Sequence, residues 1–126
     1  MSKGHYSLAL DHDRGLVRVR AQGDIGPKLG MELITEARMN AAEHQYKIIC
    51  DVRESRATVS LSDWYFLPRR LAVYKNWETR TVKTAIIVTA GRQEKVYRFF
   101  ENVTNNVGLN IKIFLDEEGA LEWFAL

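Results

Sequence analysis

Two short apolar segments constrain the fold of this 126-residue chain more than any other feature of its sequence. Residues 46–52 read YKIICDV and residues 84–89 read TAIIVT, and both are rich in β-branched side chains. Neither segment alternates apolar and polar residues through its centre. This lack of alternation is typical of a strand that is covered on both faces, as in a parallel sheet. We therefore predict that the two segments are the central strands of a largely parallel sheet.

The segments before them alternate, as half-buried strands do. Residues 5–11 and 16–22 each place apolar and polar side chains on opposite faces, and a polar turn with a glycine lies between them. Two such runs around a short turn predict an antiparallel hairpin, with Arg18 and Arg20 on its solvated side. The sequence GDIGP at residues 23–27 is expected to break the second strand.

Helical periodicity connects the strands. A surface helix is expected from Pro27, with an apolar stripe every four residues (Leu29, Leu33, Ala37 and Ala41) and Glu32, Glu36, Arg38 and Glu43 on the opposite side. Residues 91–108 carry a second stripe, formed by Val96, Phe99, Phe100, Val103 and Val107. An alternating strand at residues 109–115 is expected near the sheet edge, and Asp116 suits the cap of a last short helix.

The element order is therefore β-β-α-β-α-β-α-β-α. Strands that alternate with helices predict an α/β fold with right-handed crossovers and a mostly parallel central sheet. We expect the antiparallel hairpin at one side of this sheet and the helices packed on the faces of the sheet. The length predicts a single domain, residues 1–126.

Composition and simple sequence patterns restrict both the class of partner and the expected location of the protein. The formal net charge is only +2, which argues against nucleic acid even though Arg69 and Arg70 follow a run of aromatic residues. No apolar stretch approaches the length of a membrane span, and the first residues show no secretion signal. The single cysteine, Cys50, suits a reducing compartment, so the cytoplasm is the expected location.

Residues that could carry chemistry are few. The three histidines are scattered without ligand spacing, so no metal site is expected, and Cys50 lies in an apolar strand where a thiol is usually inert. Asp51 is expected to end its strand, and arginines follow it in the connection. A carboxylate beside arginines has a lowered pKa, so this setting suits an ion pair better than acid–base catalysis. Gly91 and Arg92 begin a helix after a strand and form a candidate anion site. No cofactor and no enzymatic activity are expected.

Residues 60–77, SLSDWYFLPRRLAVYKNW, are the most informative segment. Ser60 and Asp63 have capping-box spacing, although Ser62 could cap the helix instead. At about 100° per residue, Trp64, Leu67, Leu71 and Tyr74 form one stripe, and Phe66, Val73 and Trp77 form another. One stripe can face the sheet, and the other needs a neighbouring helix, a second subunit or an apolar ligand. Alternatively, Pro68 splits the segment into two short helices that turn both stripes inward.

In element order and local sequence, the chain resembles the STAS domain family of SpoIIAA-like anti-sigma-factor antagonists. The resemblance covers the hairpin, the strand at residues 46–52 with Asp51, the strand at 85–88 and the tail KIFLDEEGALEWF at 112–124, which is similar to stand-alone bacterial members. It implies the SpoIIAA-like fold and a non-enzymatic domain that binds a partner or a small ligand near the start of its second helix.

The chain departs from this family at the regulatory motif. Regulatory members carry Asp-Ser-Ser/Ala-Gly at the start of the second helix, and a kinase phosphorylates the serine. Residues 59–64 here read VSLSDW, without the glycine and with Leu61 near the serine position. Ser60 and Ser62 flank that position and are the candidate phosphorylation sites, since a helix N-terminus favours negative charge.

Two functions are left open by the sequence. The first is an interaction module, expected to be a homodimer, which uses the helix at 60–77 and the connection at 53–58. The second is a carrier that holds a lipid-like apolar ligand in a pocket beside the second helix, between it and the third helix. The expected partner or ligand surface comprises Asp51, Arg53, Arg56, Trp64, Phe66, Arg70, Val73 and Trp77.

Overall fold

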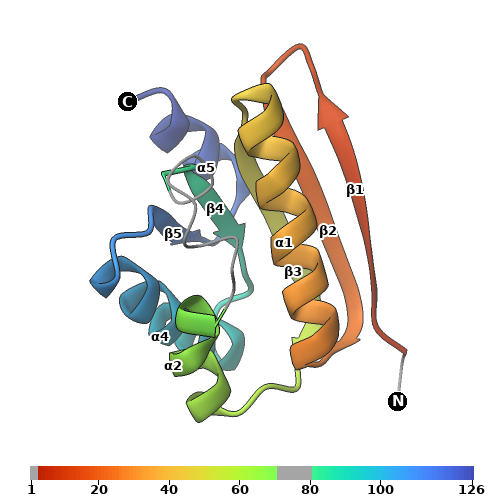
Figure 1. Ribbon diagram of the computed structural model, residues 1–126, viewed down its shortest axis with the longest axis vertical. Coiled ribbons are helices and arrows are strands. Elements are labelled where there is room, and N and C mark those ends of the chain that lie inside the picture. Colours follow the sequence, from red (N-terminus) through yellow and green to blue (C-terminus); the bar gives the residue numbers. More distant parts are fainter. Residues whose placement is uncertain (1–2, 71–80) are drawn as a thin grey trace.

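The computed structural model describes residues 3–70 and 81–126. In chain order the elements shown in Figure 1 are β1 (His5–Asp11), β2 (Leu16–Ile25), α1 (Pro27–His44), β3 (Lys47–Ala57), α2 (Leu61–Arg70), β4 (Thr84–Ile87), α4 (Arg92–Asn106), β5 (Ile111–Phe114) and α5 (Glu117–Phe124). This order confirms the predicted succession of a hairpin followed by alternating helices and strands.

The five strands form one sheet in the order β1-β2-β3-β4-β5. β1 pairs with β2 in antiparallel register, with Leu8 opposite Val19. β3 pairs in parallel with both β2 and β4, and β5 adds a last parallel strand at the edge. The predicted hairpin, the parallel centre and the edge position of the last strand are thus confirmed.

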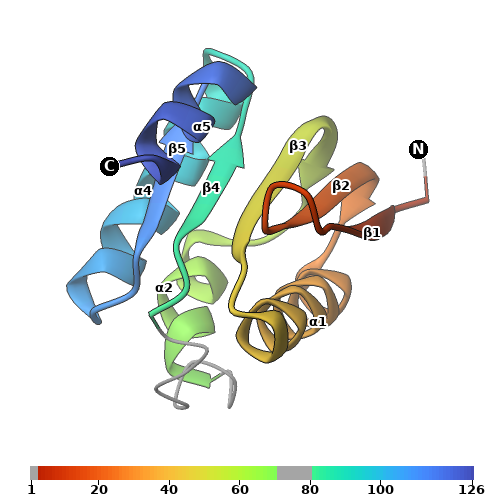
Figure 2. The same cartoon turned by 90° about the horizontal axis from the view of Figure 1, so that it is seen from above.

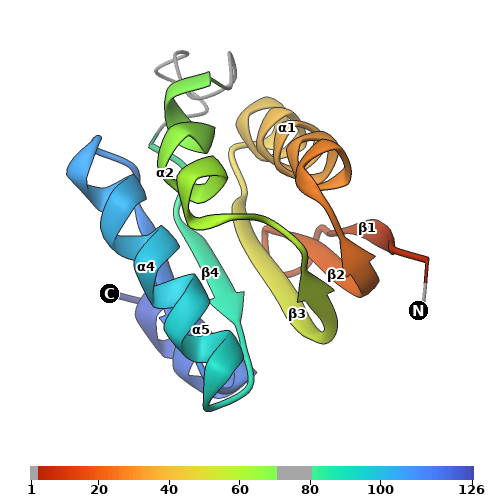
Figure 3. The same ribbon diagram turned by 90° about the horizontal axis from the view of Figure 1, so that it is seen from below.

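The helices cover the two faces of the sheet unequally. α1, α2 and α4 lie on one face, and α5 lies on the other (Figures 2 and 3). The unequal coverage follows from the strand order. When each parallel crossover is right-handed and moves in the same direction across the sheet, all the connecting helices are placed on one face.

Alternate residues of the central strands enter two different apolar clusters. Cys50 and Ile86 belong to the larger cluster, on the side of α1 and α4. Ile49, Ala85 and Ile87 belong to a smaller cluster with Ala120 and Phe124 of α5. Because both faces of β3 and β4 are buried at this level, both sets of alternate residues must be apolar, which explains the lack of alternation in the sequence.

Two strands are longer than the sequence indicated. β2 continues to Ile25 and β3 to Ala57, so the predicted break at residues 23–27 and the predicted connection at 53–58 are wrong over most of their length. After an irregularity between Arg20 and Gln22, the two strands resume parallel pairing up to Ile25 and Ala57. Gly23 adopts a φ of +76°, which a residue without a side chain accommodates readily. Backbone pairing therefore outweighs the turn-like composition of the segment.

Arg38 is a further correction, because it was expected on the solvent side of α1 but is only 2% exposed. Its Nη2 donates a hydrogen bond of 3.1 Å to Oγ1 of Thr84 on β4. Helical spacing accounts for this placement. Arg38 lies four residues after Ile34 and three before Ala41, so it belongs to the face that packs on the sheet.

The buried face of α4 is rotated relative to the predicted stripe. Phe100 and Val103 are buried as expected, but the other buried residues are Tyr97 and Thr104, whereas Val96 is only partly covered. The Thr104 hydroxyl donates to the carbonyl oxygen of Phe100, which satisfies this polar group inside the helix.

The N-cap of α5 tests the prediction, made from the local sequence, that Asp116 caps the last helix. Oδ1 of Asp116 accepts a hydrogen bond of 2.8 Å from the backbone N–H of Gly119, as predicted. Asp116→Ala should lower the free energy of unfolding by about 1 kcal/mol in urea denaturation, because the helix loses its N-cap. Asp116→Asn retains an accepting oxygen and should change it little. Equal losses in the two variants would contradict this assignment.

Candidate binding site between α1 and α2

The start of α2 is fixed by a side-chain cap. The backbone N–H of Asp63 donates to Oγ of Ser60 at 3.1 Å, so Ser60 rather than Ser62 caps the helix. The backbone N–H of Trp64 donates to the carbonyl oxygen of Ser60 at 3.0 Å. Ser60 and Ser62 are both exposed at this helix end, and phosphorylation of either serine stays a prediction.

One side of α2 is buried and the other is exposed. Trp64 and Leu67 are buried, in agreement with the stripe that was expected to face inward. Trp64 packs against α4, where its ring centroid lies 5.2 Å from that of Tyr97 and 4.8 Å from that of Phe100. α2 is therefore seated on the protein through Trp64 and Leu67, and Trp64 supplies the aromatic contacts with α4.

The outer side of α2 carries three large apolar side chains that are accessible to solvent. Leu61 is 60% exposed, Tyr65 44% and Phe66 40%. The rings of Tyr65 and Phe66 meet edge to face at 5.1 Å, and the guanidinium of Arg69 lies 4.2 Å from the centre of the Tyr65 ring. We call Leu61, Tyr65 and Phe66 the α2 patch.

The other residues of the predicted helix at 60–77 have different outcomes. α2 continues through Pro68 to Arg70, so the alternative in which Pro68 divides the helix is wrong at that position. Arg70 is the last residue of α2, whereas Val73 and Trp77 lie outside the described residues. Of the predicted apolar anchors, Phe66 alone is thus placed on the described surface.

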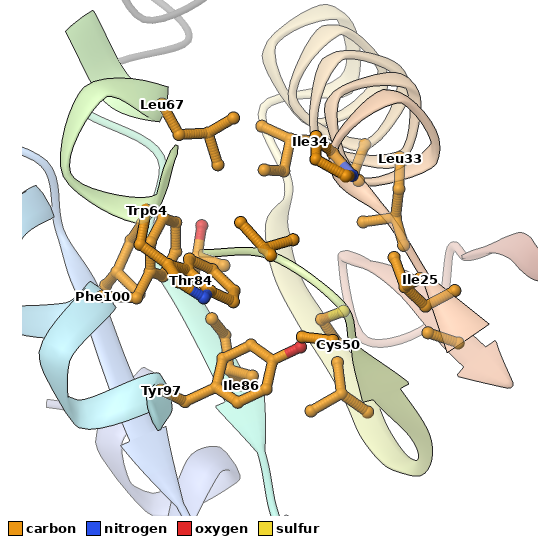
Figure 4. A pocket seen from close by; sticks show the side chains of 18 of the residues that line it. Ile25, Leu33, Ile34, Cys50, Trp64, Leu67, Thr84, Ile86, Tyr97 and Phe100 are labelled. Atoms are coloured by element: carbon orange, nitrogen blue, oxygen red, sulfur yellow. The ribbon is translucent and has the colours of Figure 1, made fainter. Parts of the chain in front are cut away.

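An apolar cavity of about 100 Å³ lies between α1 and α2, above β3 and β4 (Figure 4). Its walls include Leu33, Ile34 and Ala37 of α1, Trp64 and Leu67 of α2, Cys50 of β3, Ile86 of β4, and Tyr97 and Phe100 of α4. These five elements thus contribute to one space, which places it between the helical layer and the sheet.

A few polar groups interrupt the apolar wall. Figure 4 shows the ring of Tyr97 extending from α4 into the cavity, with its hydroxyl group directed toward Cys50. Burial raises the pKa values of both groups, to about 12 for the Cys50 thiol, so both stay neutral at physiological pH. Trp64 is 6% exposed, and its Nε1 has no hydrogen-bond partner among the described residues.

Asp51 and Arg53 lie on the other face of the sheet. Both line a shallow depression beside α5 together with Arg18 and Glu117, whereas Cys50 and Val52 face the cavity. The expected contact surface is therefore divided between two faces. The reason is that β3 runs past Asp51, so strand alternation turns Asp51 and Arg53 away from α2.

Asp51 forms the predicted ion pair. Nε of Arg53 donates to Oδ1 at 3.0 Å and Nη2 donates to Oδ2 at 2.8 Å, while the Arg53 backbone N–H donates to Oδ1. Hydrogen bonds from the Arg53 side chain, which outweigh partial burial, lower the pKa of Asp51 below its ordinary value of 3.8. Arg56 is mostly exposed and pairs loosely with Asp24 at 3.7 Å.

The candidate anion site at the start of α4 stays a prediction. Gly91 is the N-cap, with a φ of +100°, and Arg92 is exposed. The backbone N–H of Thr89 donates to Oε1 of Gln93, so one donor at this turn is already used inside the protein.

Two histidines that are distant in sequence meet in the structure. The rings of His12 and His44 are 5.9 Å apart, and Nδ1 of His12 lies 2.7 Å from the Tyr46 hydroxyl oxygen. Within residues 3–70 and 81–126, no three His, Cys, Asp or Glu side chains gather as a metal site. In the same part of the chain, no helix combines the length and apolarity needed to cross a bilayer.

Sequence reasoning placed the pocket between the second and third helices, which are α2 and α4, and missed its α1 wall. Tyr97 was not part of the predicted α4 stripe, and Ala37 was assigned only to core packing. The available signal was the small side chains of Gly30 and Ala37, which lie two turns apart on α1 and both line the cavity. Small residues on a sheet-facing side leave room that bulkier side chains would fill.

The chain has the SpoIIAA-like α/β fold. It is similar over 98% of both chains to the crystal structure of an uncharacterised DUF3478-family protein with a SpoIIAA-like fold from Shewanella loihica PV-4, with a TM-score of 0.55 and 22% identity. It is also similar to the anti-sigma factor antagonist SpoIIAA in its unphosphorylated form, with a TM-score of 0.54, 17% identity and coverage of 96% of this chain and 98% of the other. These likenesses confirm the expected fold. No family model matches the sequence, and no curated protein matches it.

The Asp51–Arg53 pair predicts a pH dependence of stability. Because the pKa of Asp51 is lowered in the folded protein, its charged form favours folding at pH values above the unfolded-state pKa. This contribution should be lost as the pH falls through the ordinary Asp value of 3.8 and then through the lower folded-state pKa. Asp51→Asn should therefore show a shallower loss of stability over this range than the wild type in urea denaturation.

A matched variant tests whether Arg53 causes the lowered pKa of Asp51. Arg53→Gln should raise the pKa of Asp51 toward its ordinary value, as followed by NMR titration of the carboxyl carbon. An unshifted Asp51 pKa in Arg53→Gln would show that Arg53 is not the cause.

Proposed function

We propose that this protein is a non-enzymatic regulatory module of the cytoplasm that binds a protein partner through the α2 patch. The observation that carries the proposal is the exposure of Leu61, Tyr65 and Phe66 side by side on one short helix. Clustered aromatic side chains of this kind supply most of the binding energy in protein interfaces. The likeness to an anti-sigma factor antagonist supports a regulatory role.

The chemistry of the described residues favours binding over catalysis. Asp51 is held as a charged ion pair, so its lowered pKa makes it a poor proton donor or acceptor near neutral pH. Burial keeps the Cys50 thiol protonated, with a pKa of about 12, which disfavours a nucleophilic role.

The partner we propose for the α2 patch is a second copy of the chain. In sedimentation velocity, the wild type should show a concentration-dependent species of twice the mass of one chain. Leu61→Ser combined with Phe66→Ser should weaken this association at least tenfold, because two apolar contacts are lost. Met39→Ser removes an exposed side chain from α1 and should leave the association unchanged.

A monomeric wild type across the accessible concentration range would contradict the homodimer. Equal association by the wild type and the double variant would also contradict it, provided that circular dichroism shows both to be folded.

The cavity favours a second candidate function, the holding of a small apolar ligand. Its walls come almost entirely from apolar side chains of α1, α2, α4 and the sheet. An apolar cavity of about 150 Å³ in another protein binds benzene. A space of about 100 Å³ is therefore suited to part of a small ring or to the end of a short chain.

Toluene tests this second function. Saturating toluene should raise the melting temperature of the wild type by about 4 °C, the shift expected from roughly 1 kcal/mol of binding in a domain of this size. Ala37→Leu fills the cavity wall and should abolish this shift. Ala9→Leu adds the same atoms at an exposed position of β1 and should retain it. Identical toluene responses in both variants would contradict ligand holding in this cavity.

A further inference from the structure

The indole nitrogen of Trp64 is an unpaired polar group in a cavity whose wall is mostly apolar. The side chain is 94% buried, and Nε1 has no hydrogen-bond partner among the described residues. Figure 4 shows the Trp64 side chain among the residues that line the cavity, beside Phe100. Buried donors in native proteins are nearly always paired, so an unpaired one indicates an additional role.

The position of Trp64 is set by packing rather than by its nitrogen. Its ring is held between α2 and α4 by contacts with Tyr97 and Phe100 at 5.2 and 4.8 Å. Phenylalanine would supply an aromatic ring for the same contacts without a donor. Tryptophan therefore adds one feature that packing does not use, an N–H group in a space of low polarity, where a hydrogen bond is strong.

The other polar groups of the wall narrow the class of ligand. Nη2 of Arg38 donates to Thr84, and the Tyr97 hydroxyl is kept neutral by burial, which raises its pKa. The Arg38 guanidinium on this wall is already engaged, and Asp63 lines the same space, so neither favours a carboxylate, which would also have to give up far more hydration than a carbonyl. A neutral oxygen acceptor therefore suits the Trp64 donor best.

We propose that the cavity binds a small apolar molecule with one carbonyl oxygen, and that this oxygen accepts a hydrogen bond from Nε1 of Trp64. The proposal rests on the second candidate function and adds the chemical class of the ligand. A volume of about 100 Å³ accommodates the carbonyl end of an aromatic ketone or of an ester rather than the whole molecule.

The test uses two probes of nearly the same shape, acetophenone and α-methylstyrene, in which a CH₂ group replaces the carbonyl oxygen. The chain has three tryptophans, so three indole N–H signals are expected in a ¹H–¹⁵N spectrum. Trp64→Phe identifies the Trp64 signal by its loss. Acetophenone should move the Trp64 indole proton downfield in a saturable titration, whereas α-methylstyrene should not.

Affinities provide a second readout. Trp64→Phe should weaken acetophenone binding about tenfold, the usual effect of removing one buried hydrogen bond, and should leave α-methylstyrene binding within about twofold. If Trp64→Phe does not fold, selective ¹⁵N-indole labelling of Trp77→Phe and of Trp123→Phe assigns the Trp64 signal by elimination, which leaves the wild-type titration decisive.

The outcomes separate the two proposals. Binding of both probes with the same indole shift, or with equal weakening by Trp64→Phe, overturns the role of the carbonyl group but leaves apolar ligand holding in place. Binding of α-methylstyrene alone has the same consequence. If neither probe nor toluene perturbs the cavity signals, both the ligand class and the second candidate function are wrong.

Discussion

The burial of β3 and β4 on both faces is the constraint on which the rest of the structure depends. Two strands made of consecutive apolar residues need cover above and below. α5 supplies that cover on one side through Ala120 and Phe124, and α1 and α4 supply it on the other. Among the described residues, α1, α2 and α4 share one face and α5 lies on the other, so the helical layers are unequal.

The cavity results from the way α1, α2 and α4 pack together on one face of the sheet. α2 rests on α4 through Trp64, and α1 lies over β2 and β3 with Gly30 and Ala37 facing the gap. Small side chains on one wall and a large aromatic side chain on the other leave about 100 Å³ between them. Burial within this layer also explains why Cys50 and Tyr97 are neutral groups, since desolvation disfavours their charged forms.

The sequence was sufficient for the architecture because its signals are local. Strand alternation around residues 5–22, the apolar strands and the Asp116 cap each depend on neighbours in the chain, and all agree with the structure. The bounds of β2 and β3 were not accessible in this way. Their extension to Ile25 and Ala57 comes from pairing between segments that are distant in sequence, which overrides local turn composition.

The candidate site was only partly accessible from the sequence. The spacing on α2 correctly separated buried Trp64 from exposed Phe66. It could not show that Asp51 and Arg53 face away from α2, because that depends on how far β3 continues. Nor could it bring Arg38 to Thr84, a contact across 46 positions of the chain. Such contacts arise from the packing of elements, which a one-dimensional pattern does not contain.

The central claim is that α1 and α2 enclose an apolar space beside Trp64. A crystal structure determined under xenon pressure tests it most directly, because xenon occupies apolar cavities without needing polar contacts. The account predicts xenon density between Ala37 and Trp64, with the helices in the positions described above. A xenon-free interior, with α1 packed directly against α2, would contradict it.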